Sequence, residues 1–256
     1  MRNYLFIAPL LLCVVGCSNA PETGRKQFIA ISSAQEIKLG QDAFLEILSE
    51  EETITTGSDY EMVQRIGRRV AAAASRLYPN AIRDYEWKFA LIDDDEMVNA
   101  WALPGGKCAV YTGLLPVTQN ENALAIVMAH EVGHVIARHG AERATQSMVA
   151  GAIASYAMKD LNEGERNLVL QAYGVSIALP FSRTQESEAD QIGLFVAADA
   201  GYDPRESIPL WQRMANASGG APFEFLSTHP SSKTRIKQLN GWMPKAMLYY
   251  EHAKAR

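Results

Sequence analysis

The spacing of apolar and polar residues predicts that the folded part of the chain begins with helices. A capping-box sequence at residues 33–36 is followed by apolar residues at helical spacing, so we expect a first helix over 33–49. A second helix is expected over 59–77, because apolar residues recur on one face and the pattern stops before Pro79. Together these helices would form a scaffold for the rest of the domain.

Short strands are predicted after the two helices. From Tyr85 to Leu91, aromatic or apolar residues alternate with polar ones, which is typical of a half-buried strand. Two more strands, over 98–103 and 107–112, flank a Pro-Gly-Gly turn at 104–106. We therefore expect a small sheet, mixed or antiparallel.

The apolar stretch that follows predicts a buried helix. A capping-box sequence at 118–121 places its start near Glu121, and Gly140 offers an end or a weak point. Because this helix is apolar on nearly every side before His130, we expect it to be buried, and its histidines with it. The order of elements predicts an α+β, mostly helical fold with the small sheet packed on this helix.

The pattern after the buried helix is harder to interpret. Two apolar stretches separated by a charged one predict two helices over 141–181, which would form a flap beside the site. A helix is then expected over 184–201, another over 204–217, and a short basic helix over 231–239. We expect residues 241–256 to be a C-terminal tail.

The N-terminal segment is typical of an exported protein. Residues 1–16 combine a positive residue with an apolar run too short to span a bilayer, which indicates a signal peptide. The sequence Val14-Val15-Gly16-Cys17 resembles a bacterial lipobox, in which Cys17 carries the lipid; an ordinary signal peptide with an incidental cysteine is the alternative. Residues 17–30 would then be a polar, lipid-anchored tether, and 31–240 a single folded domain.

Cysteine usage and charge fit this location. Cys17 is followed by Ser18 rather than by Asp, the residue associated with retention in the inner membrane, so we expect the periplasmic face of the outer membrane. Cys13 would leave with the signal peptide, so Cys108 has no intramolecular disulfide partner. The chain has a net charge of −5 and no cluster of basic residues, which argues against a nucleic-acid partner.

The sequence His-Glu-Val-Gly-His at 130–134 is a candidate metal-binding motif. Residues four apart lie on one face of a helix, so His130 and His134 can present two imidazole nitrogens to one Zn²⁺. Glu131 lies about 100° round the helix, beside the metal, where a general base for a water molecule is needed. An amphipathic helix with incidental histidines is the alternative until a third ligand is found.

The third ligand must come from elsewhere, because a catalytic zinc site keeps three protein ligands. The position six residues after the second histidine is Gly140, and His139 comes one residue too early, which excludes the class with a third histidine there. Glu186 is the best candidate, since Asp190 lies on the same helix face and could accept the outer N–H of a ligating imidazole. Glu188 lies about 160° round from Glu186, so only one of the two can ligate. A helix with solvated glutamates is the alternative.

These motifs together carry a resemblance. The segments His-Glu-Val-Gly-His from His130 and F-S-R-T-Q-E-S-E-A-D from Phe181 resemble the gluzincin metallopeptidase family of the CAAX prenyl protease, HtpX and the mitochondrial OMA-type protease. The blocks V-N-A-W-A-L-P-G-G from Val98 and S-T-H-P from Ser227 match as well, so the resemblance spans about 31–239. It implies a zincin-like (gluzincin) catalytic domain.

Residue roles follow from the resemblance. It implies one Zn²⁺ per chain, with roles shared as follows: His130, His134 and Glu186 as ligands, Glu131 as the base, and Asp190 in support. HtpX and the prenyl protease are multi-span membrane proteins, whereas this chain has no predicted span and resembles the soluble, lipid-anchored envelope branch. A prenylated substrate is therefore not expected.

Two further parts of the site have open interpretations. His229 precedes Pro230, so it is either a capping residue or an imidazole near the zinc that steadies the oxyanion or occupies the open position in a resting form. The strand carrying Asn99, Ala100 and Ala102 could bind an extended substrate by strand addition, or could be an ordinary hairpin edge.

The predicted function is a zinc-dependent endopeptidase of the bacterial cell envelope. Its substrates would be misfolded or unassembled envelope polypeptides, and its membrane contact would be the lipid anchor. A zinc-stabilised periplasmic holdase without turnover is the alternative, but a structural zinc site needs no base such as Glu131. A zinc hydrolase acting on another bond would share the same residues.

Overall fold

The computed structural model describes residues 16–146, 181–217, 225, 227, 229 and 233–256. The predicted signal peptide over 1–16 and flap over 141–181 fall almost entirely outside these ranges. Within them, no helix has the length and the apolar character needed to cross a membrane.

A four-stranded sheet forms the middle of the domain. The strands β3 (Thr53–Ile54), β4 (Lys88–Ile92), β6 (Lys107–Tyr111) and β5 (Ala100–Leu103) lie in that order. The pair β4–β6 is parallel and the other two pairs are antiparallel, so the sheet is mixed. The strand β5 is therefore an edge, and its outer side pairs with no strand in the described part of the chain.

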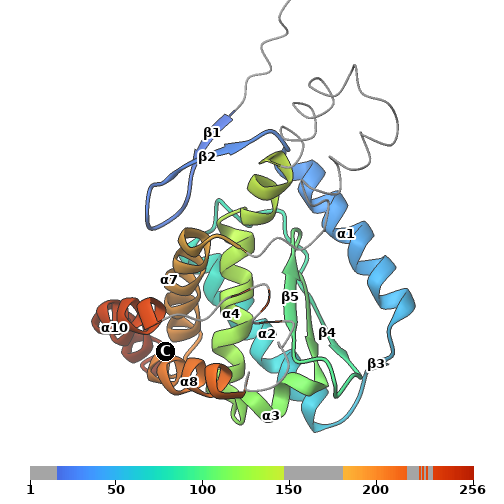
Figure 1. Ribbon diagram of the computed structural model, residues 1–256, viewed down its shortest axis with the longest axis vertical. Coiled ribbons are helices and arrows are strands. Elements are labelled where there is room, and N and C mark those ends of the chain that lie inside the picture. Colours follow the sequence, from blue (N-terminus) through green and yellow to red (C-terminus); the bar gives the residue numbers. More distant parts are fainter. Residues whose placement is uncertain (1–15, 147–180, 218–224, 226, 228, 230–232) are drawn as a thin grey trace, which may run out of the picture.

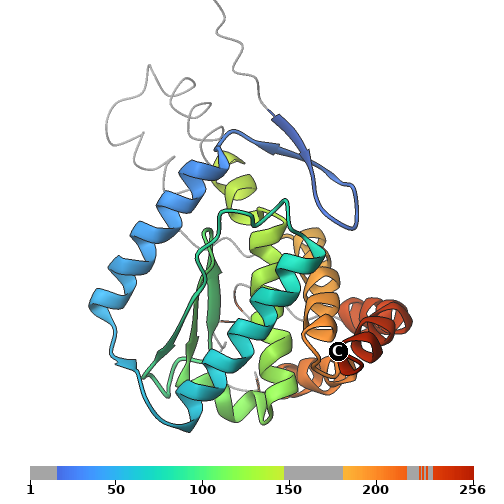
Figure 2. The same ribbon diagram turned by 180° about the vertical axis from the view of Figure 1, so that it is seen from behind.

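Helices cover both faces of the sheet. The helix α1 (Ser33–Glu50) lies on one face, and α2 (Ser58–Leu77) and α4 (Glu121–Ile136) lie on the other (Figures 1 and 2). These bounds agree with the predicted helices, but the first capping box is made by Ser32 with Gln35, one residue earlier than expected.

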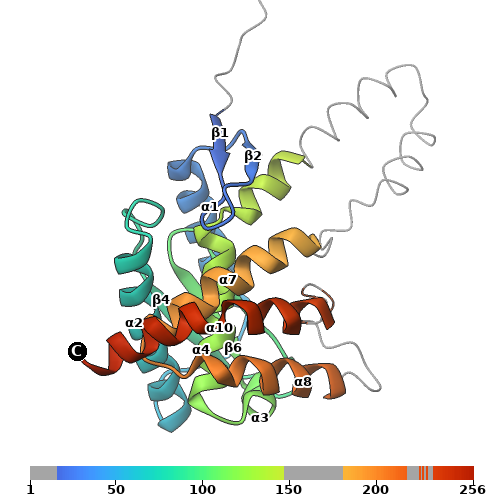
Figure 3. The ribbon, with the colours of Figure 1, turned by 90° about the vertical axis from the view of Figure 1, so that its left-hand side faces the viewer.

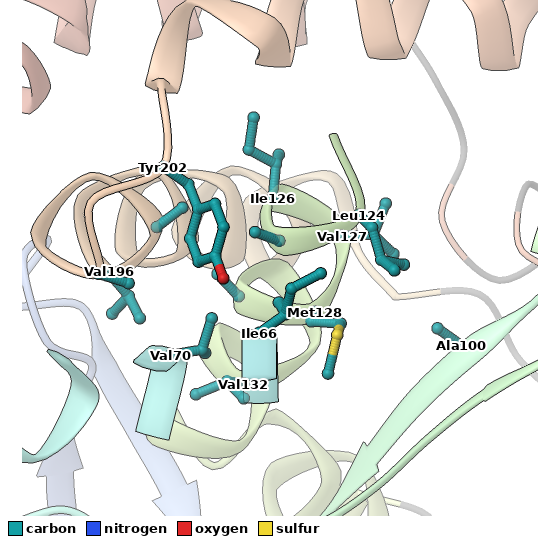
Figure 4. Close-up of a cluster of buried hydrophobic side chains, with 14 of the residues drawn as sticks. Ile66, Val70, Ala100, Leu124, Ile126, Val127, Met128, Val132, Val196 and Tyr202 are labelled. Atoms are coloured by element: carbon teal, nitrogen blue, oxygen red, sulfur yellow. The ribbon is translucent and has the colours of Figure 1, made fainter. Parts of the chain in front are cut away.

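The core forms around α4, whose residues are buried from its third position onward. Ile66 and Val70 of α2, Val196 and Tyr202 from the C-terminal half, and side chains of α4 meet in one apolar cluster (Figure 4). Each fully buried Val, Leu or Ile side chain contributes about 1.5–3 kcal/mol. This burial fixes the helix that carries the histidines.

The ends of α4 differ from the prediction. The helix α3 (Leu115–Thr118) precedes it, and Asn120 is the actual N-cap, accepting a hydrogen bond from the Ala123 amide. At the other end α4 stops at Ile136, four residues before Gly140, and a new helix runs over 139–146. Arg138 breaks the helix, because it has φ = 56° and bonds to Glu36 and to the Ile31 carbonyl.

The C-terminal half packs against α4 through α7 (Arg183–Asp199). A 3₁₀ turn at Pro204–Glu206, α8 (Ser207–Ala217) and α10 (Lys233–Lys254) follow. The predicted tail over 241–256 is wrong, because α10 continues to Lys254 and packs along α7 (Figure 3). The helix includes Pro244, and apolar contacts such as that between Tyr249 and Phe195 hold it in place.

The predicted tether is also part of the fold. Strands β1 (Gly16–Asn19) and β2 (Lys26–Ile29) form an antiparallel hairpin that lies beside the helix over 139–146 and the start of α7 (Figure 1). Its polar composition suggested a solvated linker over 17–30, but Arg25 is paired with buried carboxylates of the domain. The folded domain therefore begins at the hairpin.

Candidate metal centre

Two neighbouring helices carry the predicted metal ligands. His130 and His134 lie one turn apart on α4, and Glu186 lies in the first turn of α7. The helices approach closely because of Gly193, where an added Cβ would lie only 2.8 Å from the His130 backbone nitrogen. This close packing brings the glutamate to the histidines.

Four side chains converge on one point. The ligand atoms of His130, His134, Glu186 and His229 all lie within 4.8 Å of one another. His130 Nε2 is 3.2 Å from His134 Nε2, and His229 Nδ1 is 2.9 Å from Glu186 Oε1. All four side chains are buried. His229 thus takes the fourth place of the cluster.

This donor set fits Zn²⁺. Zinc is commonly bound by imidazole nitrogen and carboxylate oxygen in a tetrahedral arrangement of four donors. The three imidazoles and one carboxylate of this cluster provide four such donors. Burial lowers the pKa of His134 well below its usual value, which keeps the imidazole neutral and able to bind a metal. Zinc is therefore the cofactor that the buried cluster accommodates.

Asp190 lies where the sequence placed it, behind the first histidine. Its Oδ1 is 3.1 Å from His130 Nδ1, so the imidazole Nε2 is left to face the metal site. Asp190 is in turn bound by Arg235, whose Nη2 and Nε lie 2.6 and 2.7 Å from the two carboxylate oxygens. Arg235 Nη1 also lies 2.8 Å from Glu186 Oε2.

Sequence reasoning missed Arg235. It lies in the stretch that was interpreted as a short basic helix, where a solvated face is the usual expectation for a charged residue. The guanidinium instead stacks on the Trp211 ring, with the guanidinium carbon 3.6 Å from the ring centre. In the sequence, only the position of Arg235 six residues after His229 could have indicated that it lies near the metal centre.

His139, which we had considered only as a rejected third ligand, lies behind the second histidine. Its Nδ1 is 3.0 Å from His134 Nδ1, and its Nε2 is 2.9 Å from Glu188 Oε2. Burial would raise the pKa of Glu188, but hydrogen bonds from His139, Arg25 and Thr23 outweigh it and hold the pKa at about 2. Glu186 thus faces the metal site and Glu188 faces away, as the helical spacing predicted.

Glu131 is buried beside the cluster. No hydrogen-bond donor reaches its Oε1 in the described part of the chain, and His229 Nε2 is 3.5 Å away. Burial raises the pKa of Glu131, while His229 and His130 oppose that shift. Glu131, Ala100 and Cys108 line a cavity of about 10 Å³, which is roughly the space of one water molecule.

The predicted substrate strand lies next to this cavity. Ala100 and Ala102 belong to β5 and pair with Val110 and Cys108 of β6. The Asn99 side chain accepts a hydrogen bond from the Ala100 amide, and so is used locally. The predicted lipidation site, Cys17, lies in β1 of the hairpin and pairs with Phe28.

The close contact between α4 and α7 gives a first testable expectation. Gly193→Ala should lower the free energy of unfolding by about 1–3 kcal/mol, because the new methyl group overlaps the His130 backbone. The matched control is Gly241→Ala in α10, where an added Cβ meets nothing within 4 Å. That control should leave stability unchanged or raise it by up to about 1 kcal/mol. Urea denaturation measures both, and equal stability of the two variants would contradict the packing argument.

Comparison with known proteins places these residues in a family. Residues 58–243 match the model of peptidase family M48. The mitochondrial metalloendopeptidase OMA1 of Schizosaccharomyces pombe is 36% identical over 237 residues, covering 90% of this chain and 68% of the relative. OMA1 of Saccharomyces cerevisiae is 31% identical over 267 residues, covering 95% and 76%.

A bacterial relative is also similar. The β-barrel assembly-enhancing protease of Escherichia coli K12 is 28% identical over 227 residues, which cover 84% of this chain but only 45% of that protein. The family match includes both helices of the metal centre, His229 and Arg235. The chain is therefore a zinc metalloendopeptidase that belongs to peptidase family M48.

Proposed function

We propose that this protein is an envelope endopeptidase that cleaves unfolded or misassembled polypeptides at the buried metal centre. The observation that carries the proposal is the position of Glu131, a buried carboxylate beside the converging zinc ligands, with one oxygen that accepts no hydrogen bond from the described residues. A purely structural zinc site has no use for such a group.

In this proposal His130, His134 and Glu186 hold the zinc. The bound metal would lower the pKa of a water molecule and polarise the scissile carbonyl. Glu131 takes the proton from that water and then passes it to the leaving amine. Asp190 and Arg235 keep the His130 ring in the orientation that presents Nε2 to the metal.

His229 would have to move before water and substrate can enter. Its Nδ1 lies 3.3 Å from His130 Nε2 and occupies the fourth place of the donor set. We propose that this arrangement is a resting form, and that the displaced imidazole then faces the oxyanion and steadies it. Of the two earlier interpretations, the burial and position of His229 favour the one near the zinc over a simple capping role.

The strand β5, whose outer side pairs with no other described strand, supports an extended polypeptide as the substrate. Peptides bind sheet edges through main-chain hydrogen bonds, which require an extended chain and little specific sequence. Asn99, Ala100 and Ala102 would form this edge, and the small alanine side chains leave room beside Glu131. Unfolded chains supply extended segments, whereas folded proteins do not.

A lipid anchor at Cys17 would hold this site near a membrane. Cys17 lies in the hairpin that is docked on the catalytic domain, so a lipid there would leave little distance between the bilayer and the domain. We propose the periplasmic face of the outer membrane as the location. The name of the bacterial relative, which refers to β-barrel assembly, is consistent with such a location.

The test is cleavage of an unfolded outer-membrane β-barrel protein, with the folded barrel as the control. The zinc-loaded protein should cut the unfolded form only, and removal of zinc by a chelator should abolish cutting until zinc is restored. Binding without any cleavage would favour the holdase alternative.

In cells, Cys17→Ser should release the protein from the membrane fraction, and retention there would contradict the anchor.

A further inference from the structure

Arg25 of the N-terminal hairpin bridges two buried carboxylates. Its Nε and Nη2 each lie 2.9 Å from an oxygen of Glu188, and its Nη1 and Nη2 lie 2.6 and 2.8 Å from the oxygens of Glu142. The Glu188 side chain is 0% exposed and that of Glu142 is 5% exposed. One guanidinium therefore bridges and orients both carboxylates, which lie 117 and 163 residues further along the sequence.

Neighbouring hairpin residues reinforce this contact. Thr23 Oγ1 donates to Glu188 Oε1 at 2.6 Å, and Gln27 Nε2 donates to Glu142 Oε2 at 3.2 Å. Gln27 Nε2 also lies 2.8 Å from the Ala137 carbonyl, at the turn that ends α4. The hairpin thus binds the elements immediately behind the second histidine ligand.

Hydrogen bonds lead from Arg25 to the metal centre. His134 faces the site with Nε2, so its proton must be on Nδ1, which lies 3.0 Å from His139 Nδ1. His139 must then accept with Nδ1 and donate from Nε2, which lies 2.9 Å from Glu188 Oε2. Each proton position is fixed by the next partner, and Arg25 holds the last acceptor in place.

We propose that Arg25 is a positioning residue of the metal centre, and that the docked N-terminal hairpin is required for full zinc affinity. The inference rests on the proposed zinc site and extends it to a segment outside the residues that match the family model. Without the guanidinium, Glu188 loses its fixed orientation, His139 loses its acceptor, and the His134 ring is free to turn.

Loss of such outer partners weakens metal affinity by about 10- to 100-fold in zinc enzymes. Because Arg25 acts through Glu188 and His139, we expect an effect near the lower end of that range. A purely structural role for Arg25 would instead lower stability and leave the zinc dissociation constant unchanged.

The test compares full-length variants by competition for zinc with a chromogenic chelator. Arg25→Gln should raise the zinc dissociation constant about 10-fold and alter the visible spectrum of the Co²⁺-substituted protein. Arg25→Lys should restore part of the affinity, since lysine keeps the positive charge but cannot donate parallel hydrogen bonds to both carboxylates as the planar guanidinium does. The matched control is Arg205→Gln, which removes an exposed arginine whose guanidinium donates hydrogen bonds to both oxygens of a single carboxylate, that of Asp203.

A second variant covers the case in which Arg25→Gln fails to fold. Glu188→Gln keeps the shape of the side chain but removes the charge that Arg25 binds, and it should weaken zinc to a similar extent. Wild-type affinity and an unchanged Co²⁺ spectrum in either folded variant would overturn the inference. The outcome is separate from proteolysis, because a wild-type protein that binds zinc tightly but cleaves nothing would refute only the proposed function.

Discussion

Glu131→Gln should abolish cleavage of unfolded polypeptides and leave zinc bound. Glutamine keeps the size of the side chain but cannot take a proton from water, so we expect the turnover rate to fall by about 10³-fold or more. The ligand set of His130, His134 and Glu186 is unchanged in this variant. Zinc content is measured by atomic absorption, and turnover is measured with unfolded casein.

The control for this variant is Glu121→Gln at the exposed start of the same helix. Glu121 pairs with Arg65 on the surface, and its removal should leave turnover unchanged. Within the described ranges, one oxygen of the buried Glu131 carboxylate has no hydrogen-bond donor, so neutralising this carboxylate should not lower the free energy of unfolding. Cleavage by Glu131→Gln at a rate close to that of the wild type would remove Glu131 from the mechanism.

Arg235→Met should lower the free energy of unfolding by about 3–5 kcal/mol, since it leaves two buried carboxylates without their counter-charge. Arg235 binds both Asp190 and Glu186, and all three side chains are at most 4% exposed. Methionine still packs on Trp211, so lost packing contributes little. Urea denaturation of the zinc-free protein measures the effect without a contribution from metal binding.

A surface arginine provides the comparison. Arg65→Met removes an ion pair whose partners are 46% and 42% exposed, so it should cost about 1 kcal/mol or less. Zinc should recover part of the stability of Arg235→Met, because the metal supplies positive charge to Glu186. A cost for Arg235→Met as small as that for Arg65→Met would show that the buried network is not coupled to stability.

The parts of the site that follow helical spacing could be predicted from the sequence. His130 and His134 share a face because they are one turn apart, and Glu186 with Asp190 form the matching pair on a second helix. In the structure, Asp190 Oδ1 lies 3.1 Å from His130 Nδ1. The buried character of α4 was equally visible, because it has no polar face.

The residues that were missed depend on turns and on distant contacts. His139 reaches His134 only because the chain leaves the helix at Arg138, which has a positive φ, and helical periodicity does not reveal such a break. Arg235 and Arg25 looked solvated, since a charged residue in a polar segment usually is, and only the folded chain shows the buried carboxylates that they bind. The hairpin was predicted to be a tether and the C-terminal part of α10 a tail.

The most direct test of the account is an anomalous difference map from crystals of the zinc-loaded protein, measured at the zinc absorption edge. If these residues bind the zinc, we expect one strong peak per chain, within bonding distance of His130 Nε2, His134 Nε2 and a Glu186 carboxylate oxygen. A peak bound by other residues, or no peak at these atoms in a protein that cleaves polypeptides, would contradict it.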